Sequence, residues 1–161
     1  MKIAMIGAGN LATNLAKALY AKGHEIIEVY SRTMESAREL ASCVEATPRN
    51  DINDVTCDAD IYILALKDSV LGDIIPPLCE GRIDSVFVHT AGSVSIDVFK
   101  GHAIRYGVVY PMQTFSKSRE MDFSIIPVFV EASDKGTLGT LETLAYSVSD
   151  VVRTLYAPSR R

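Results

Sequence analysis

The sequence contains no tryptophan and only three cysteines among its 161 residues. Cys43, Cys57 and Cys79 are odd in number and widely spaced, so they match neither a disulfide framework nor a zinc or C-x-x-C pattern. We therefore expect reduced thiols in a cytoplasmic protein. The sequence also lacks a cluster of metal ligands, a hydrolase serine elbow and a Walker motif, which predicts a protein without a metal site.

Long apolar runs and basic stripes are missing as well. No apolar run approaches the length of a membrane span, and glycines and asparagines interrupt the apolar residues after Lys2 that would otherwise resemble a signal peptide. The formal net charge of -4 and the lack of a Lys/Arg-rich stripe argue against a nucleic-acid partner. With 48% hydrophobic and 22% charged residues, the composition indicates one soluble domain whose core needs no disulfides.

The first stretch of the chain carries the most informative motif. An apolar run from Lys2 breaks at Gly7, and a helical pattern begins near Asn10. Gly7, Gly9 and Ala12 stand at the spacing of the G-x-G-x-x-G/A dinucleotide fingerprint. Gly7 permits a tight turn, Gly9 lets a pyrophosphate approach the backbone, and Ala12 lets the helix pack against the strand. A glycine turn of purely structural meaning is the alternative interpretation.

The helix that follows this loop predicts where phosphates would bind. Its first free N–H groups, near Asn10 and Leu11, point toward the loop, and the helix dipole favours negative charge there. We therefore expect the backbone of residues 7–11, which include Ala8, to hold the pyrophosphate of a dinucleotide.

The rest of the chain alternates predicted strands and helices. Strands are predicted at residues 24–30, 61–66, 85–90, 104–110, 125–131 and 151–156. Residues 46–58 are predicted as a loop, with a short third strand inside it as the alternative. Helices are predicted after Gly9, from Met34 to Val44, after Asp68 or Ser69 as a cap, and from Ser133 or Asp134. Pro127 indicates an edge strand or a bulge. Strand–helix–strand units force parallel pairing, so we predict an α/β protein with a doubly wound, Rossmann-type, mostly parallel sheet and helices on both faces.

The end of the second strand predicts the choice of cofactor. A carboxylate there would bind the adenine ribose hydroxyls of NAD, but the sequence has Ser31, Arg32 and Thr33, and Glu28 lies inside the strand. The planar guanidinium of Arg32 suits a 2′-phosphate, with two hydroxyl donors beside it. NADP is therefore favoured over NAD. A compatible alternative is that Arg32 is solvated and that Ser31 or Thr33 caps the next helix.

Two further strand ends complete the predicted crevice. Ligands of open parallel sheets bind beyond the carboxyl ends of the strands, here at Ala65-Leu66-Lys67 and Thr90-Ala91-Gly92. Small residues at positions 65, 91 and 92 leave room for a flat ring and its ribose, although small residues also simply turn a chain. Lys67 suits a hydrogen bond to the cofactor ribose or phosphate, and a solvated loop lysine is the alternative.

Catalytic residues are the least determined part of the prediction. His89 titrates near neutrality and is a candidate acid or base, but a histidine at a strand end is more often structural. Polar residues around Pro111, among them Tyr110 and Gln113, would line a substrate pocket or only satisfy the loop backbone. His89 and Gln113 therefore stay weak candidates, and no catalytic residue is assigned.

Several of these segments together resemble one superfamily. Residues 7–12, 31–33, 65–67 and 89–93 resemble the NADP-binding domain of pyrroline-5-carboxylate reductases and F420-dependent NADP oxidoreductases. The segment from Tyr110 to Ser116 is most similar to the uncharacterised Rossmann-like oxidoreductases of that superfamily, which carry a helical C-terminal domain of unknown function. A histidine often precedes the proline of that segment, and Tyr110 departs from this pattern, which weakens an acid/base role there.

The resemblance implies a function and an architecture. It implies an NADP(H)-dependent oxidoreductase that transfers a hydride to or from a small imine or carbonyl substrate, or another redox cofactor such as F420. Residues 1–156 would form the NADP-binding domain and residues 157–161 the start of a linker. A helical second domain missing from this sequence would form a homodimer and close the substrate site. The alternative is a non-catalytic module that senses NADP(H) or binds a partner.

The predicted NADP(H)-binding residues come from the four strand ends and the helices that follow them. They are Gly7, Ala8, Gly9, Asn10, Leu11, Ser31, Arg32, Thr33, Ala65, Leu66, Lys67, Val70, Thr90, Ala91 and Gly92.

Overall fold

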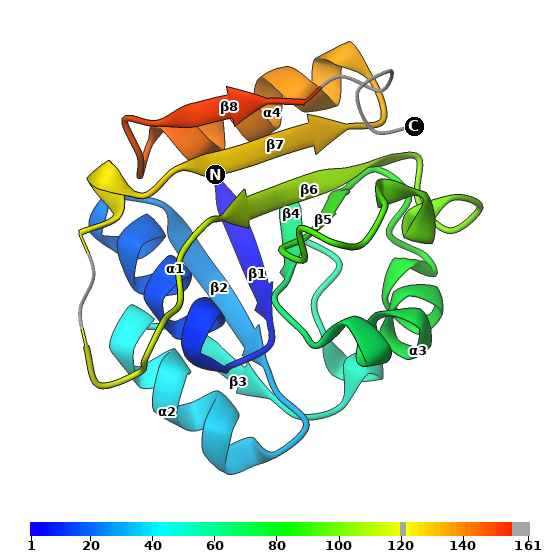
Figure 1. Ribbon diagram of the computed structural model, residues 1–161. Coiled ribbons are helices and arrows are strands. Elements are labelled where there is room, and N and C mark those ends of the chain that lie inside the picture. The colour runs from blue at the N-terminus through cyan, green and yellow to red at the C-terminus, as the bar shows by residue number, and fades with distance from the viewer. Residues whose placement is uncertain (120–121, 156–161) are drawn as a thin grey trace.

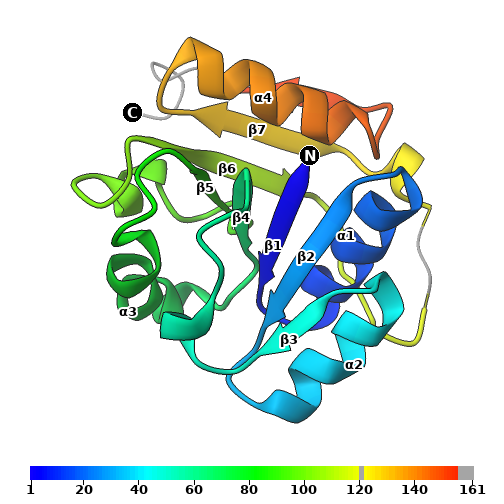
Figure 2. The same ribbon diagram turned by 180° about the vertical axis from the view of Figure 1, so that it is seen from behind.

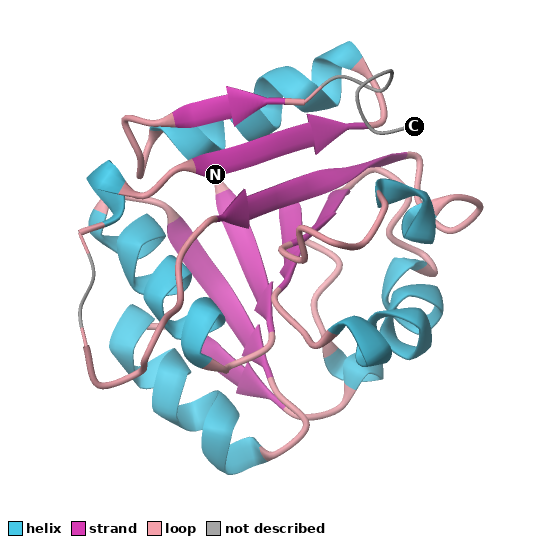
Figure 3. Cartoon of the chain, viewed as in Figure 1, coloured by secondary structure: helices cyan, strands magenta, loops and turns pink. Residues whose placement is uncertain are grey.

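The computed structural model describes residues 1–119 and 122–155, and an eight-stranded sheet forms the centre of this part of the chain (Figure 1). The strands are β1 (Lys2–Ile6), β2 (Glu25–Tyr30), β3 (Thr47–Arg49), β4 (Ile61–Leu64), β5 (Val86–His89), β6 (Arg105–Pro111), β7 (Val128–Ala132) and β8 (Val152–Thr154). The helices are α1 (Asn10–Ala21), α2 (Met34–Val44), α3 (Asp68–Cys79) and α4 (Lys135–Tyr146). Short 3-10 turns are η1 (Ile52–Asp54), η2 (Ile96–Phe99) and η3 (Phe123–Ile125). Figure 3 shows how helices and strands alternate.

The strand order is β3-β2-β1-β4-β5-β6-β7-β8. Neighbouring strands pair in parallel, except that β6 and β7 are antiparallel. The predicted α/β class and the mostly parallel sheet are therefore confirmed. From β1 the chain winds outward to β3, and it then returns to place β4 on the other side of β1. The connections after β1 and β4 consequently diverge, which opens a crevice beyond the carboxyl ends of these strands.

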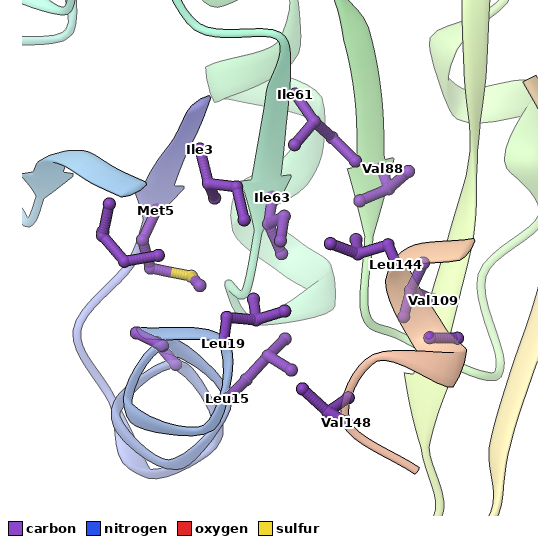
Figure 4. Packing of buried hydrophobic residues seen from close by; sticks show 14 of the residues in the cluster. Ile3, Met5, Leu15, Leu19, Ile61, Ile63, Val88, Val109, Leu144 and Val148 are labelled. Carbon is purple, nitrogen blue, oxygen red and sulfur yellow. The ribbon is translucent and has the colours of Figure 1, made fainter. Parts of the chain in front are cut away.

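Side chains of the central strands alternate between two faces, and each face has its own core. On one face Ile63 packs with Leu15 and Leu19 of α1, in a cluster to which α2 and α4 also contribute (Figure 4). On the other face Tyr62 and Leu64 belong to a cluster that includes α3. In both views α3 lies apart from α1 and α2 (Figures 1 and 2). Helices thus cover both faces of the sheet, as the doubly wound prediction requires.

Pro127 occupies a different place from the predicted one. It precedes β7, which lies between β6 and β8, so it marks neither a sheet edge nor a bulge. Its carbonyl oxygen accepts the N–H of Met112 at 2.8 Å. The carbonyl oxygen of Pro127 therefore adds one hydrogen bond to the β6–β7 pairing. The missing N–H of the proline is not needed for this bond.

Helix α3 departs from the prediction at its first residues. Its N-cap is Lys67, without a side-chain hydrogen bond, so neither Asp68 nor Ser69 caps it. The helix then continues through Pro76 and Pro77. Both prolines lie in the last turn, and the carbonyls that they leave without a helical partner belong to exposed residues, where water can hydrogen-bond them.

Cys43, Cys57 and Cys79 form no disulfide with one another in this structure. Cys43 and Cys57 are exposed, whereas burial raises the pKa of the Cys79 thiol to about 12, so this thiol stays protonated at neutral pH. The described residues hold no group of three or more potential metal ligands. No described helix has the length and apolar character that crossing a bilayer requires. Of the last predicted strand, residue 156 lies outside the described residues.

The central strand β4 offers a test of the core. Ile63 is fully buried, whereas Ile104 is 61% exposed. We expect Ile63→Ala to lower the free energy of unfolding by about 2–5 kcal/mol, because the truncation leaves a cavity between β4 and α1. The matched control Ile104→Ala should change it by less than about 0.5 kcal/mol. Urea denaturation measures both, and equal losses would contradict the described packing.

Candidate cofactor site

Two adjoining clefts form a crevice along the carboxyl ends of β1, β2, β4 and β5. The first, of about 330 Å³, is lined by Gly7, Ala8, Gly9, Tyr30, Ser31, Arg32, Ala65, Leu66, Lys67, Val70 and Ile74. The second, of about 470 Å³, is lined by Gly9, Asn10, Leu11, Ala12, Ala65, Leu66, Lys67, Asp68, Thr90 and Ala91. The two share Gly9 and residues 65–67, so the crevice is continuous across the ends of the strands.

The two glycines of the first loop play different parts. Gly7 has a φ of +122°, and a Cβ there would overlap the carbonyl oxygen of Ala65. It is therefore needed for the close approach between β1 and β4. A Cβ built on Gly9 meets no atom within 4 Å. Because Gly9 lines both clefts, its missing side chain leaves open space next to the backbone at the middle of the crevice.

The helices that border the crevice begin without side-chain caps. The N-caps of α1 and α3 are Gly9 and Lys67, and neither side chain makes a capping hydrogen bond. In contrast, Thr33 caps α2 and Asp134 caps α4. The first backbone N–H groups of a helix seek acceptors, and the helix dipole favours an anion there. Both helix starts at the crevice therefore offer donors to an anionic ligand.

The end of β2 places a cation in the first cleft. Arg32 is exposed and lines this cleft together with Ser31 and Lys67. No carboxylate lines the cleft among the described residues. Thr33 lies outside both clefts, and its hydroxyl accepts the N–H of Ser36 at the start of α2. The capping alternative thus holds for Thr33, whereas Ser31 and Arg32 lie where a ligand would reach them.

Of the two acidic residues in β2, Glu25 begins the strand and Glu28, nearer the crevice, is engaged elsewhere. Glu28 is buried, and its carboxylate accepts hydrogen bonds from Arg49 Nε at 2.9 Å and from the N–H of Thr56 at 2.7 Å. The backbone carbonyl oxygen of Arg49, at the end of β3, accepts the N–H of Ser31 at 3.0 Å. Glu28 therefore joins β3 to β2 and does not reach the crevice.

Of the cofactor-binding residues predicted at the end of β5, some line the crevice and one does not. Thr90 and Ala91 line the second cleft. Gly92 does not, because the ring of Tyr110 lies over it, and a Cβ on Gly92 would come within 2.5 Å of Tyr110 Cε2. The small residue at position 92 thus serves the packing of β6. His89 lines neither cleft and is fully buried.

Comparison with known proteins agrees with this geometry. The family model of NADP oxidoreductases that depend on coenzyme F420 matches residues 2–91, from β1 to the loop after β5. The chain belongs to the F420-dependent NADP oxidoreductase family. The matched part contains every residue that lines the two clefts, and the resemblance stated from the sequence is confirmed.

Solved and curated relatives extend this likeness. A Bacteroides fragilis protein assigned as an NADP oxidoreductase is 50% identical, with a TM-score of 0.94 over 99% of this chain and 62% of its own. A pyrroline-5-carboxylate reductase from Coxiella burnetii shares the fold, with a TM-score of 0.76 at 21% identity over 95% of this chain and 58% of its own. A glutamyl-tRNA reductase from Shouchella clausii is 41% identical over 63 residues, 38% of this chain and 14% of that protein. The chain thus spans less than two thirds of each of these relatives.

The structure brings the predicted cofactor residues together, apart from Thr33 and Gly92, along one crevice of this family's fold. Four lining residues were missed by the sequence analysis: Ala12 and Asp68 in the first turns of two helices, Tyr30 at the end of β2, and Ile74. Ile74 follows Val70 by one helical turn, so a helical projection of α3 would have found it.

The loop after β6 lies beside α1 and holds the other weak catalytic candidate. Gln113 is exposed and lines neither cleft, and its side-chain oxygen accepts the N–H of the next residue at 3.1 Å. The loop is fastened by Asn14 of α1, whose amide donates to the carbonyl of Ser116 at 2.9 Å. Phe115 is buried and stacks on Phe123 at 5.4 Å between ring centroids. Nothing in this arrangement gives Gln113 a partner in acid–base chemistry.

The glycine loop yields a paired stability prediction. Gly7→Ala should lower the free energy of unfolding by more than about 2 kcal/mol, because alanine is strained at a positive φ and its Cβ overlaps Ala65. Gly9 has a φ of -78° and open space around it, so Gly9→Ala should stay within about 0.5 kcal/mol of the wild type. Thermal or urea unfolding compares the two variants. A Gly7→Ala protein as stable as Gly9→Ala would refute the assigned contact.

Proposed function

We propose that this chain is the cofactor-binding domain of an NADP-dependent oxidoreductase. The enzyme would transfer a hydride between NADP(H) and a small imine or carbonyl substrate, or another redox cofactor such as F420. Family membership supports the oxidoreductase class, and the 50% identical Bacteroides relative is assigned as an NADP oxidoreductase. The choice of NADP rests on the first cleft of this chain.

The observation that carries the proposal is the charge of that cleft. Arg32 and Lys67 line it without any carboxylate among the described residues. Of the two acids of β2, Glu25 lies at the start of the strand, and Glu28 is buried and paired with Arg49. An NAD site of this fold uses an acidic residue at this strand end to bind the ribose hydroxyls. Two cations and the hydroxyl of Ser31 instead suit a 2′-phosphate.

The other residues of the crevice would hold the rest of the dinucleotide. The backbone at Gly9, with the uncapped start of α1, suits the pyrophosphate, because donors and open space coincide there. Apolar Val70 and Ile74 would contact the adenine, and Thr90 and Ala91 would border the nicotinamide. The bound nicotinamide would supply the hydride chemistry. The protein's part is then to orient it and to exclude water from one side.

The substrate side of the site is the second part of the proposal. We propose that residues 1–156 act as the cofactor domain, and that a second, helical domain completes the substrate site and forms a homodimer. The share of the relatives that this chain spans, 62% and 58%, supports a further domain in the whole protein. No acid or base is assigned among the residues described.

The charge argument predicts selective loss of NADPH affinity. Arg32→Ala should weaken NADPH binding by about ten- to a hundredfold, because a hydrogen bond to a charged group contributes about 1.5–3 kcal/mol. NADH, which lacks the 2′-phosphate, should be affected less than about threefold. Fluorescence titration of both coenzymes measures the ratio.

A matched control for this variant lies one turn into α2. Arg38 is exposed and lines neither cleft, so Arg38→Ala should leave both affinities unchanged. Equal losses of NADPH and NADH affinity in Arg32→Ala, or a wild type that binds NADH more tightly, would disprove the assigned specificity.

Activity is tested on the full-length protein. We expect oxidation of NADPH, followed by the absorbance of the reduced nicotinamide, when one of three acceptor classes is added: a cyclic imine, a small ketone or F420. NADH should be a poorer donor in the same assay. Tight NADPH binding without turnover of any acceptor would instead support a module that senses the coenzyme.

A further inference from the structure

A buried histidine holds the loop that forms one end of the crevice. His89, the last residue of β5, is fully buried. Its Nδ1 accepts the backbone N–H of Ala91 at 3.0 Å, and its Nε2 lies 3.4 Å from the carbonyl oxygen of Ser95. The ring therefore contacts the loop of residues 90–95 near its beginning and at its end, and Thr90 and Ala91 of this loop line the second cleft.

The two contacts of His89 are both compatible with one tautomer of its imidazole ring. A backbone N–H only donates and a carbonyl only accepts, so both contacts are satisfied together by a neutral imidazole with its hydrogen on Nε2. The ring also stacks on Phe99 of η2 at 5.9 Å between centroids, with 19° between the planes. Hydrogen bonding and stacking thus fix the position of the imidazole on the face of the sheet away from α1.

Other contacts hold the same loop from its remaining sides. Ser93 Oγ donates to Asp68 Oδ2 at 3.1 Å, which links the loop to the first turn of α3. The ring of Tyr110 lies against Gly92. Among these contacts, the bond to His89 Nδ1 is made by the backbone of a residue that itself lines the cleft.

We propose that His89 is a positioning residue for the nicotinamide end of the crevice. By accepting the N–H of Ala91, His89 fixes the backbone position of Thr90 and Ala91 where they border the second cleft. The inference rests on the proposed NADP(H) function. It assigns His89 a role in binding one half of the coenzyme without contact between them, and it leaves the adenosine end, about Arg32, independent of this residue.

Two substitutions and two ligands test the role. His89→Phe keeps the ring and its stacking on Phe99 but removes the acceptor, whereas His89→Asn keeps an acceptor near the position of Nδ1. In the proposed site NADPH would extend along the whole crevice, whereas adenosine 2′,5′-bisphosphate contains only the half that Arg32 would bind. Affinities for both ligands are measured by titration, with thermal unfolding of each variant as a check of folding.

We expect His89→Phe to weaken NADPH by about tenfold, the size of one lost hydrogen bond to the backbone. Binding of adenosine 2′,5′-bisphosphate should change less than twofold, and His89→Asn should restore most of the NADPH affinity. Equal weakening of both ligands, no change in either, or failure of Asn to do better than Phe would overturn the inference. A wild-type chain that binds neither ligand would overturn the proposed function and this inference with it.

Discussion

The backbone at Gly7 is the constraint on which the crevice depends. Its N–H donates to the carbonyl of Tyr30 at 2.8 Å, and the space of its missing side chain is taken by the carbonyl oxygen of Ala65. One residue thus joins the ends of β1, β2 and β4 at a separation that any side chain would enlarge. Helix α1 starts three residues later, so the direction of its free N–H groups is set by the same point.

Hydrogen-bond donors and charges are distributed to match this geometry. The two helices that begin at the crevice, α1 and α3, leave their first N–H groups without side-chain caps, whereas Thr33 and Asp134 cap α2 and α4. The nearby cations, Arg32 and Lys67, are not balanced by a carboxylate in the first cleft. In the free protein water can hydrogen-bond these donors and cations, and an anionic ligand would take the place of that water.

The sequence was sufficient for the features that local rules determine. The spacing of Gly7 and Gly9, the apolar runs of the central strands and the capping by Asp134 depend on neighbouring residues, and the structure agrees with each. Contacts between distant segments were not predictable in this way. Gly92 is small because Tyr110, eighteen positions later, packs on it, and this contact exists only once β5 and β6 are side by side.

The same distinction explains the remaining differences. Pro127 carries a local signal for an edge, but the place of β7 between two strands is decided by the later pairing of β8. Whether Tyr30 lines the first cleft depends on which face of the sheet its side chain occupies, and the sequence of a single strand does not reveal this. His89 is a polar residue in an apolar strand, and only the folded loop shows what its ring nitrogens hold.

The ion pair between the buried Glu28 and the partly exposed Arg49 separates the anchoring of the sheet edge from the choice of coenzyme. The carboxylate fastens the outer strand β3, while the residues that would read the coenzyme, at positions 31 and 32, follow after the end of the strand. Replacing Arg32 by an acidic residue would therefore leave the Glu28–Arg49 pair that holds β3 unchanged. Under the proposed coenzyme assignment, the preference for NADP over NAD would depend on one or two surface positions and not on the core beneath them.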